Sequence, residues 1–367
     1  MTVYWTDYFP STCRSNYTYL ATSEFLLNAY HFTAIFTIPL AVFTFYVIIR
    51  VTPNKMKNMK TPLLIAHAWS TNLDVFFTVL AAPMVFFPSA SAIPLGTFGA
   101  LGLDSHIVAF MGQFSIIMIA INFIMLLENR HSQISMITVQ IRDRKTRIVY
   151  FVVNYILAFL YILPFYLDGD DQLELRKFVF KRIPCPTIEF YERGTLVLLK
   201  GGEFLPFLSI TGGLIIVLGQ SLFFYGHTAW HLNYVKNARV SESTKALQKK
   251  FLGYVTVQVC PFVDISRKKN RNIFLKITIP WTILAGPIIY SLYADRYNYY
   301  NQAANNIAML SMAIHGILST ACMIFIIKPY REFVVELIKG NQFNANDMWA
   351  TQANVPQVSV RLGSVDS

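Results

Sequence analysis

Seven stretches of about twenty mostly apolar residues limit what this chain of 367 residues can fold into. At about 1.5 Å per residue, a helix of that length crosses the hydrocarbon core of a bilayer. Within lipid each stretch has to be helical, because a helix satisfies its own backbone groups. The predicted fold is all-α: a polytopic membrane protein built as a bundle of seven transmembrane helices. The stretches are residues 29–49, 63–87, 105–127, 148–167, 204–226, 273–294 and 303–327.

The composition supports a membrane protein over the other large classes. Hydrophobic residues make up 54% of the chain and charged residues 14%, against about 25% charged in soluble domains. This excludes a disordered chain, a collagen-like fibre and an ordinary soluble enzyme. The sequence contains no G-x-S-x-G, H-E-x-x-H, P-loop or G-x-G-x-x-G motif. We therefore predict that the protein is not an enzyme, and we expect neither a cofactor nor a metal.

The distribution of basic residues sets the predicted orientation. Lys and Arg concentrate in the loops 50–62, 128–147 and 227–250, whereas the loops 88–104 and 295–302 hold only Arg296 between them. Cytoplasmic loops carry the Lys/Arg excess, so the N-terminus is predicted outside and the C-terminus inside. The net charge of +11 thus indicates membrane topology, and we expect the lipid bilayer, not nucleic acid, as the partner of these residues. The N-terminal residues lack the pattern of a cleavable signal peptide.

Four parts follow from this pattern: an extracellular N-terminus (1–28), the seven-helix domain (29–327), an amphipathic juxtamembrane helix (328–340) and a disordered cytosolic tail (341–367). The sixth helix is interrupted near 264–272 by a basic stretch that hydrocarbon does not accommodate cheaply. Two interpretations stay open. Either 273–294 is the sixth span and 251–272 extends the third inner loop, or residues near 264–275 are an insertion, native or arising from an error in the predicted coding sequence.

Polar residues inside the spans are candidate functional groups. Asp74 lies on one face of the second span with His67, Ser70 and Thr78, and it is the only acid within a regular span. An intramembrane carboxylate suggests a sodium site, a proton site or a switch, and the alternative is a structural hydrogen bond. In the third and seventh spans, His106, Gln113 and Asn306 are among the polar residues that either line a cavity open to the outside or serve helix packing.

Three further features concern the predicted surfaces. Cys13 and Cys185 both fall on the outer side, where they either form a disulfide or remain separate thiols. Asn16 heads an N-x-T sequon in the predicted outer N-terminus, a possible N-glycosylation site. His227 and His231 have the spacing of a zinc-binding pair, but their place at the end of the fifth span favours an interfacial role over a metal site.

Local motifs make the chain resemble the nematode serpentine chemoreceptors of class H (Srh), within the Str superfamily, over most of residues 13–340. These motifs are TPNKMKNMK after the first span, HAWSTNLDVFF in the second, LLENRHS closing the third, IPCPTIEFY around Cys185, LQKKF entering the sixth and KPYRE after the seventh.

The resemblance implies a G-protein-coupled-receptor-like protein of the plasma membrane, in sensory cilia of chemosensory neurons. Such a receptor binds a small chemical ligand outside and signals through a heterotrimeric G protein. It would place a signalling switch at Glu128, Asn129 and Arg130, with Asp74 and the Pro329–Tyr330–Arg331 motif contributing. The ligand would bind near the outer ends of the helices, with His106, Phe110, Gln113, Phe207 and Asn306 as candidates. The alternative function is a transporter or ligand-gated channel, which internal repeats would favour, and the sequence shows none.

Overall fold

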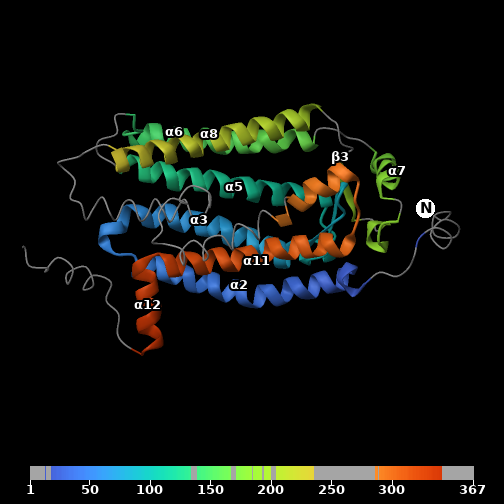
Figure 1. Ribbon diagram of the computed structural model, residues 1–367, viewed down its shortest axis with the longest axis horizontal. Helices are drawn as coiled ribbons and strands as arrows, with labels where there is room; N and C mark the ends of the chain where they lie inside the picture. Colours follow the sequence, from blue (N-terminus) through green and yellow to red (C-terminus); the bar gives the residue numbers. More distant parts are fainter. Residues whose placement is uncertain are drawn as a thin grey trace, which may run out of the picture.

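In the computed structural model of this chain, six long helices lie side by side among the described residues (Figure 1). They are α2 (Ser23–Val51), α3 (Lys57–Val75), α5 (Ser105–Ser132), α6 (Arg144–Ile162), α8 (Phe204–Tyr234) and α11 (Gln302–Ile326). A three-stranded sheet and the short helix α7 (Gln172–Arg182) lie at one end, called here the sheet end. The amphipathic helix α12 (Lys328–Ile338) projects sideways from the opposite end, called the α12 end. The structure describes residues 13, 18–133, 139–166, 171–183, 185–191, 194–199, 204–234, 286–287 and 289–340.

The long helices coincide with the predicted spans. Within the described residues, five helical segments are long and apolar enough to cross a membrane: Ser23–Val51, Lys57–Leu80, Ser105–Ser132, Arg144–Tyr166 and Gln302–Phe325. Helix α8 covers the predicted fifth span, and its 31 residues suffice for a crossing at about 1.5 Å each. The predicted sixth span (273–294) lies mostly outside the described residues, as do the basic stretch 264–272 and the tail 341–367.

Capping side chains fix where several helices begin. The Thr22 hydroxyl accepts a hydrogen bond from the Phe25 backbone N–H at 3.2 Å at the start of α2. Asp104, Asp143 and Asn301 cap α5, α6 and α11 in the same way. These are the residue types that best satisfy the unpaired N–H groups of a first turn.

One face of the bundle is apolar and uncovered. On α6, large apolar side chains are about half exposed, including Ile148, Val152, Ile156 and Leu160. Exposure of this kind along a whole helix is typical of a surface that contacts lipid. The buried core continues on the other side of the bundle, where Tyr30, Phe76, Phe86 and Met309 belong to one cluster near the sheet.

The sheet corrects one sequence-based expectation. The predicted second span reached residue 87, but its helix ends with the π-helical turn η4 (Phe76–Leu80), and the chain continues as β1 (Pro83–Val85) and β2 (Ala90–Pro94). Proline disfavours a helical residue before it, and Ala82 takes a left-handed backbone conformation, φ 41°. The predicted outer loop 88–104 therefore contains a strand and the short helix α4 (Thr97–Ala100).

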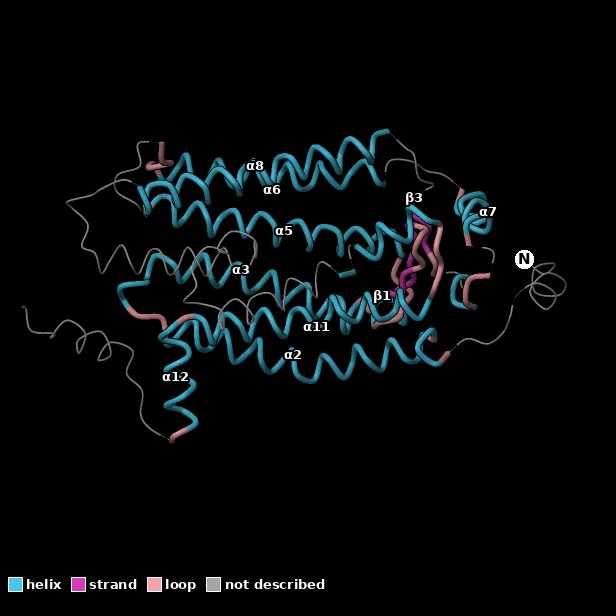
Figure 2. The backbone as a smooth tube through the Cα atoms, in the orientation of Figure 1, coloured by secondary structure: helices cyan, strands magenta, loops and turns pink. Residues whose placement is uncertain are grey.

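The third strand comes from a distant part of the chain. Strand β3 (Leu196–Leu199) pairs antiparallel with β2, and β2 pairs antiparallel with β1, so the order is β1-β2-β3 (Figure 2). Met84 faces Ile93 across the first pair, and Ala92 faces Leu196 across the second. The segment between α6 and α8, expected to be a long external loop, thus contributes a strand to a sheet that closes one end of an otherwise all-α bundle.

Candidate functional site

A cavity of about 270 Å³ lies between the sheet and the helices beneath it. Its walls come from η4, the β1–β2 hairpin, β3, the first turns of α5 and Met309 of α11. The helix α5 presents Val108, Gly112 and Gln113 among its lining residues, at spacings that place them on one side of a helix. Segments far apart in the sequence therefore enclose one space at the sheet end.

Gly112 allows α5 to approach η4 closely. A Cβ atom at this position would lie 2.9 Å from Cε1 of Phe76, closer than real contacts allow. The Phe76 ring is itself buried and lines the cavity. The glycine thus helps to set the distance between two cavity walls.

The lining is mainly apolar, with a few polar groups that retain hydrogen-bonding capacity. Ser89 and Ser91 are buried, and neither hydroxyl has a hydrogen-bond partner in the described part of the chain. The Gln113 carbonyl oxygen accepts a hydrogen bond from the Tyr166 hydroxyl at 3.3 Å. No Asp, Glu, Lys or Arg is among the described lining residues. Such a lining suits a neutral organic molecule better than an ion.

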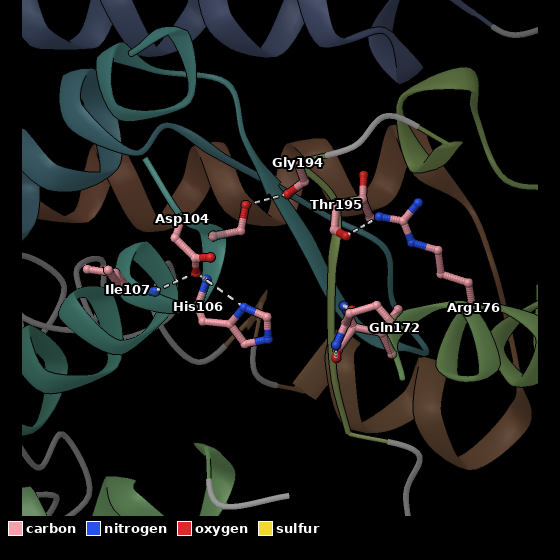
Figure 3. A network of polar contacts seen from close by, with 9 residues as sticks. Asp104, His106, Ile107, Gln172, Arg176, Gly194 and Thr195 are labelled. Atoms are coloured by element: carbon pink, nitrogen blue, oxygen red, sulfur yellow. Dashed lines mark hydrogen bonds and ion pairs between the residues drawn. The ribbon is translucent and has the colours of Figure 1, made fainter. Parts of the chain in front are cut away.

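The three-stranded sheet forms one wall of the cavity and is called here its roof. Side chains of α7 hold the edge strand β3 of this roof in place (Figure 3). The Gln172 amide accepts from the Val197 backbone N–H at 3.0 Å and donates to the Val197 carbonyl at 3.2 Å. Arg176 donates to the Thr195 carbonyl at 2.6 Å. From the helix α5, the Ser105 hydroxyl donates to the Gly194 carbonyl at 2.5 Å. The roof is thus tied to the helices on both sides through its backbone.

The N-terminal segment is fastened to the same end. A disulfide joins Cys13 to Cys185, as one of the two sequence-based alternatives predicted, with the Cα atoms 5.6 Å apart. The Ser23 backbone N–H donates to Glu189 at 3.2 Å. Asn16, the sequon residue, lies outside the described residues. Two contacts far apart in sequence therefore connect the N-terminal segment to the chain between α7 and β3.

One of the five predicted pocket residues, Gln113, lines the cavity. Asn306 is fully buried and donates to the backbone carbonyls of Leu20 and Thr22, so it anchors the N-terminal turn. Phe110 stacks on Phe114 and meets Phe159 and Tyr166 edge to face.

The other two candidates have different outcomes. His106 is about half exposed, and its ring contacts the capping carboxylate of Asp104 at 3.2 Å. The backbone N–H of His106 donates to that carboxylate as well, and this hydrogen bond is the main cause of a lowered pKa at Asp104. The Phe207 side chain lies outside the described part of the chain. Of the five candidates, Gln113 lines the cavity, and His106, Phe110 and Asn306 lie outside its lining.

Sequence reasoning missed the hairpin residues, because residues 81–87 read as the end of an apolar span. A usable signal was present. Pro83, Pro88 and Pro94 interrupt this region, and the residues from Ser89 to Ala92 alternate between serine and alanine. Prolines at this density argue against a continuous helix, and alternation with period two is typical of a strand.

At the α12 end, the acidic residue of the predicted switch has a different partner from the expected one. Glu128 is buried, and its carboxylate accepts from Arg147 of α6, with Nε–Oε2 at 2.7 Å. The resemblance suggested a pair between the acid and the arginine of the Glu128–Asn129–Arg130 motif. Helical geometry explains the difference, because residues two apart in a helix point to different sides. Glu128 thus connects α5 to α6.

Asn129 and Arg130 take part in a separate set of contacts. The Asn129 amide donates to the Asn58 carbonyl at 3.1 Å, which links α5 to the start of α3. The Gln133 side chain donates to Asn129 at 2.5 Å and accepts from Arg130 at 3.1 Å. Glu128 and Asn129 thus connect α5 to two neighbouring helices, and Arg130 bonds to Gln133 at the end of α5.

Asp74 lies where α3 packs against α11, opposite Gly316. It is buried, and a Cβ atom at Gly316 would lie 2.0 Å from its Oδ1 atom. Neither His67 nor Thr78 bonds to the Asp74 carboxylate: His67 contacts the Ala41 carbonyl at 3.1 Å, and the Thr78 hydroxyl donates to the backbone carbonyl of Asp74. The carboxylate therefore occupies the interior of the bundle, where glycine makes room for it.

The motif after the seventh span fixes the junction of α12. Tyr330 is fully buried, and its hydroxyl lies 2.8 Å from the Thr52 hydroxyl at the end of α2. Pro329 occupies the first turn of α12, where a missing backbone N–H costs nothing. Arg331 donates to the Phe325 carbonyl at 3.3 Å. These residues join α12 to both α2 and α11.

The described residues contain no group of three or more His, Cys, Asp or Glu side chains that could hold a metal ion. The closest arrangement is a pair of rings, in which Nε2 of His131 and Nδ1 of His227 lie 2.8 Å apart. His231 packs edge-on to His227. The ring nitrogens thus contact one another between α5 and α8.

The sequence is similar to known proteins over nearly its whole length. A family model described as the serpentine-type seven-transmembrane G-protein-coupled chemoreceptor Srh matches residues 21–266 and 262–340. The chain is 23% identical to serpentine receptor class H-72 of Caenorhabditis elegans over 336 residues, which cover 91% of each protein.

Proposed function

Because the chain belongs to the Srh family of serpentine seven-transmembrane chemoreceptors, we propose that it binds a small environmental molecule at the sheet end and signals through a heterotrimeric G protein at the α12 end. As a member of this family it is a multi-pass membrane protein and a receptor. We further propose the plasma membrane of sensory cilia as its location.

The proposed orientation puts the sheet end outside. The disulfide between Cys13 and Cys185 lies at this end, and such bonds persist on the oxidising side of a membrane. The basic loops that follow α2 and α5 lie at the other end, as expected for cytoplasmic loops. Glycosylation of Asn16 would agree with this orientation.

The cavity of about 270 Å³ beneath the sheet is the observation that carries the proposal. It lies at the proposed outer end, it is mostly apolar, and three chain segments far apart in sequence enclose it. Pockets that bind small molecules have this character: apolar walls with a few polar groups.

The helix α5 offers a direct connection between the two ends. It carries Gln113 at the cavity and Glu128 at the α12 end within one continuous helix. A ligand that binds one position of α5 more tightly would shift the population toward it. We propose that this shift acts on the Glu128–Arg147 ion pair, and that Asn129 and Arg130 then contact the G protein. Asp74 and the Pro329–Tyr330–Arg331 junction would follow the same movement.

The test is to express the full chain in cells with a G-protein reporter and apply a panel of neutral, acidic and basic small molecules. The proposal expects a ligand-dependent reporter signal that G-protein inhibition abolishes. A ligand-dependent current that persists under that inhibition, with no reporter signal, would instead support a transporter or channel. An N-terminal epitope tag that antibodies reach only after permeabilisation would contradict the proposed orientation.

A further inference from the structure

The volume of the cavity limits the size of a ligand. An engineered protein cavity of about 150 Å³ holds a single benzene molecule. By that comparison, a cavity of about 270 Å³ accommodates about ten non-hydrogen atoms. A sugar chain or a peptide of several residues does not fit.

The lining limits the charge of a ligand. None of the described lining residues carries a formal charge. An ion moved from water into such a space loses its hydration without gaining a partner, and that loss is large. Phe76, Phe77 and Met309 instead provide apolar contact area for a hydrocarbon body.

The buried hydroxyls indicate one polar group on the ligand. Ser89 and Ser91 lie on the hairpin with exposed fractions of 3% and 5%, and their hydroxyl oxygens have no partner among the described residues. Both residues line the cavity. A buried hydroxyl without a partner is unfavourable, so a hydroxyl that turns about its Cα–Cβ bond to donate a hydrogen bond to a ligand oxygen loses this penalty.

Resting on the proposed function, we infer that the cavity takes an uncharged molecule of about ten non-hydrogen atoms, with a hydrocarbon body and a carbonyl or hydroxyl oxygen that the serine hydroxyls of Ser89 and Ser91 bind. Ketones, aldehydes, esters and alcohols of this size belong to the class. Carboxylates, amines and plain hydrocarbons of the same shape are excluded or bind more weakly.

A matched series of probes tests this inference. The compounds are cyclohexylacetone, propylcyclohexane, 3-cyclohexylpropanoate and 3-cyclohexylpropylammonium, which share a ring and differ in the polar group. Binding is measured on the purified full chain in detergent as the rise in thermal unfolding temperature with probe concentration. We expect the ketone to bind about tenfold more tightly than the hydrocarbon, and the two ions to give no shift.

A double alanine variant tests whether the two serine hydroxyls bind the ketone. Ser89→Ala combined with Ser91→Ala should weaken ketone binding about five- to tenfold and leave hydrocarbon binding unchanged. The control is Ser311→Ala on α11, whose hydroxyl donates to the Ile307 carbonyl within its own helix. The unliganded unfolding temperature reports whether each variant folds. Ala109→Leu, which fills the cavity from α5, should abolish binding of both neutral probes.

The outcomes separate this inference from the proposed function. Selective ketone binding that needs the two serines, without any reporter signal in cells, supports the inference and contradicts G-protein signalling. A reporter signal evoked by either ion, or one that the double serine variant leaves unchanged, supports the receptor function and overturns the inference. Absence of any shift with both neutral probes also overturns it.

Discussion

The two ends of the bundle are held together by different physical means. At the sheet end, hydrogen bonds of Gln172 and Arg176 with backbone atoms, together with one disulfide, fix a roof over an uncharged cavity. At the α12 end, the buried Glu128 pairs with Arg147. A neutral site with unpaired hydroxyls is stabilised when a ligand supplies the missing hydrogen bonds. A buried ion pair, by contrast, is destabilising when one of its two charges loses its partner. Under the proposed function, the comparison teaches that one end is suited to accept a molecule and the other to respond when two helices separate.

The largest effect expected concerns the covalent link at the sheet end. Replacing both Cys13 and Cys185 by serine should lower the free energy of unfolding by about 5 kcal/mol, because the bond closes a loop across a separation of 172 residues. Thermal unfolding of the purified protein measures it, with Cys322→Ser on α11 as the control. An unchanged unfolding temperature would show that the roof does not depend on this link.

The ion pair at the α12 end should give the next largest effect. Arg147→Ala leaves the Glu128 carboxylate buried without its cation, and should cost about 2 kcal/mol, below the value for a fully buried pair, because the Arg147 side chain is 32% exposed. Basal reporter signalling should also rise. Arg144→Ala, an exposed arginine of the same helix, is the matched control. Equal effects of the two substitutions would contradict a specific role for the pair.

A smaller effect is expected from the edge strand of the roof. Gln172→Ala removes both hydrogen bonds to Val197 and should cost about 1 kcal/mol. Glu174→Ala on the same helix removes only an exposed contact to Lys177 and serves as the control. Hydrogen exchange at the Val197 amide gives a local readout. Protection equal to that of the native protein would mean that α7 does not support β3.

The smallest effect is a dependence on acid at the start of α5. The backbone N–H of His106 lowers the pKa of Asp104, so the stabilisation is complete above the ordinary aspartate pKa of about 4 and disappears as the pH falls through the lowered value. Asp104→Asn should therefore lower stability at pH 7 by a few tenths of a kcal/mol. The stability difference between the native protein and this variant should disappear in acid, and thermal unfolding at pH 7 and at a pH below the lowered Asp104 pKa would show it. A difference that persists in acid would assign it to another group.

The sequence predicted the helices well because hydropathy and span length are local properties. The segments now seen as α2, α5, α6, α8 and α11 were all expected from their apolar lengths. The hairpin was missed since a short apolar run is compatible with either a helix end or a strand. Its pairing with β3 joins Ala92 to Leu196, a contact that no local pattern encodes.

The candidate site was harder to predict for a related reason. Gln113 was found because its helix face and depth are readable from sequence, and it does line the cavity. Ser89 and Ser91 were not found, because a serine becomes a candidate binding residue only when its hydroxyl is buried without a hydrogen-bond partner, which depends on the fold. The partner of Glu128 was likewise not predictable, because only the packing of the helices places Arg147 of α6 beside it.

The roof of the cavity has a consequence for how receptors of this design diversify. Its strands are joined by main-chain pairing and by the Gln172 amide, none of which depends on the identity of the side chains that point inward. Substitutions at those inward positions can change which molecules the cavity prefers while the roof keeps its shape. A single scaffold can thus carry different chemical preferences without being refolded for each one.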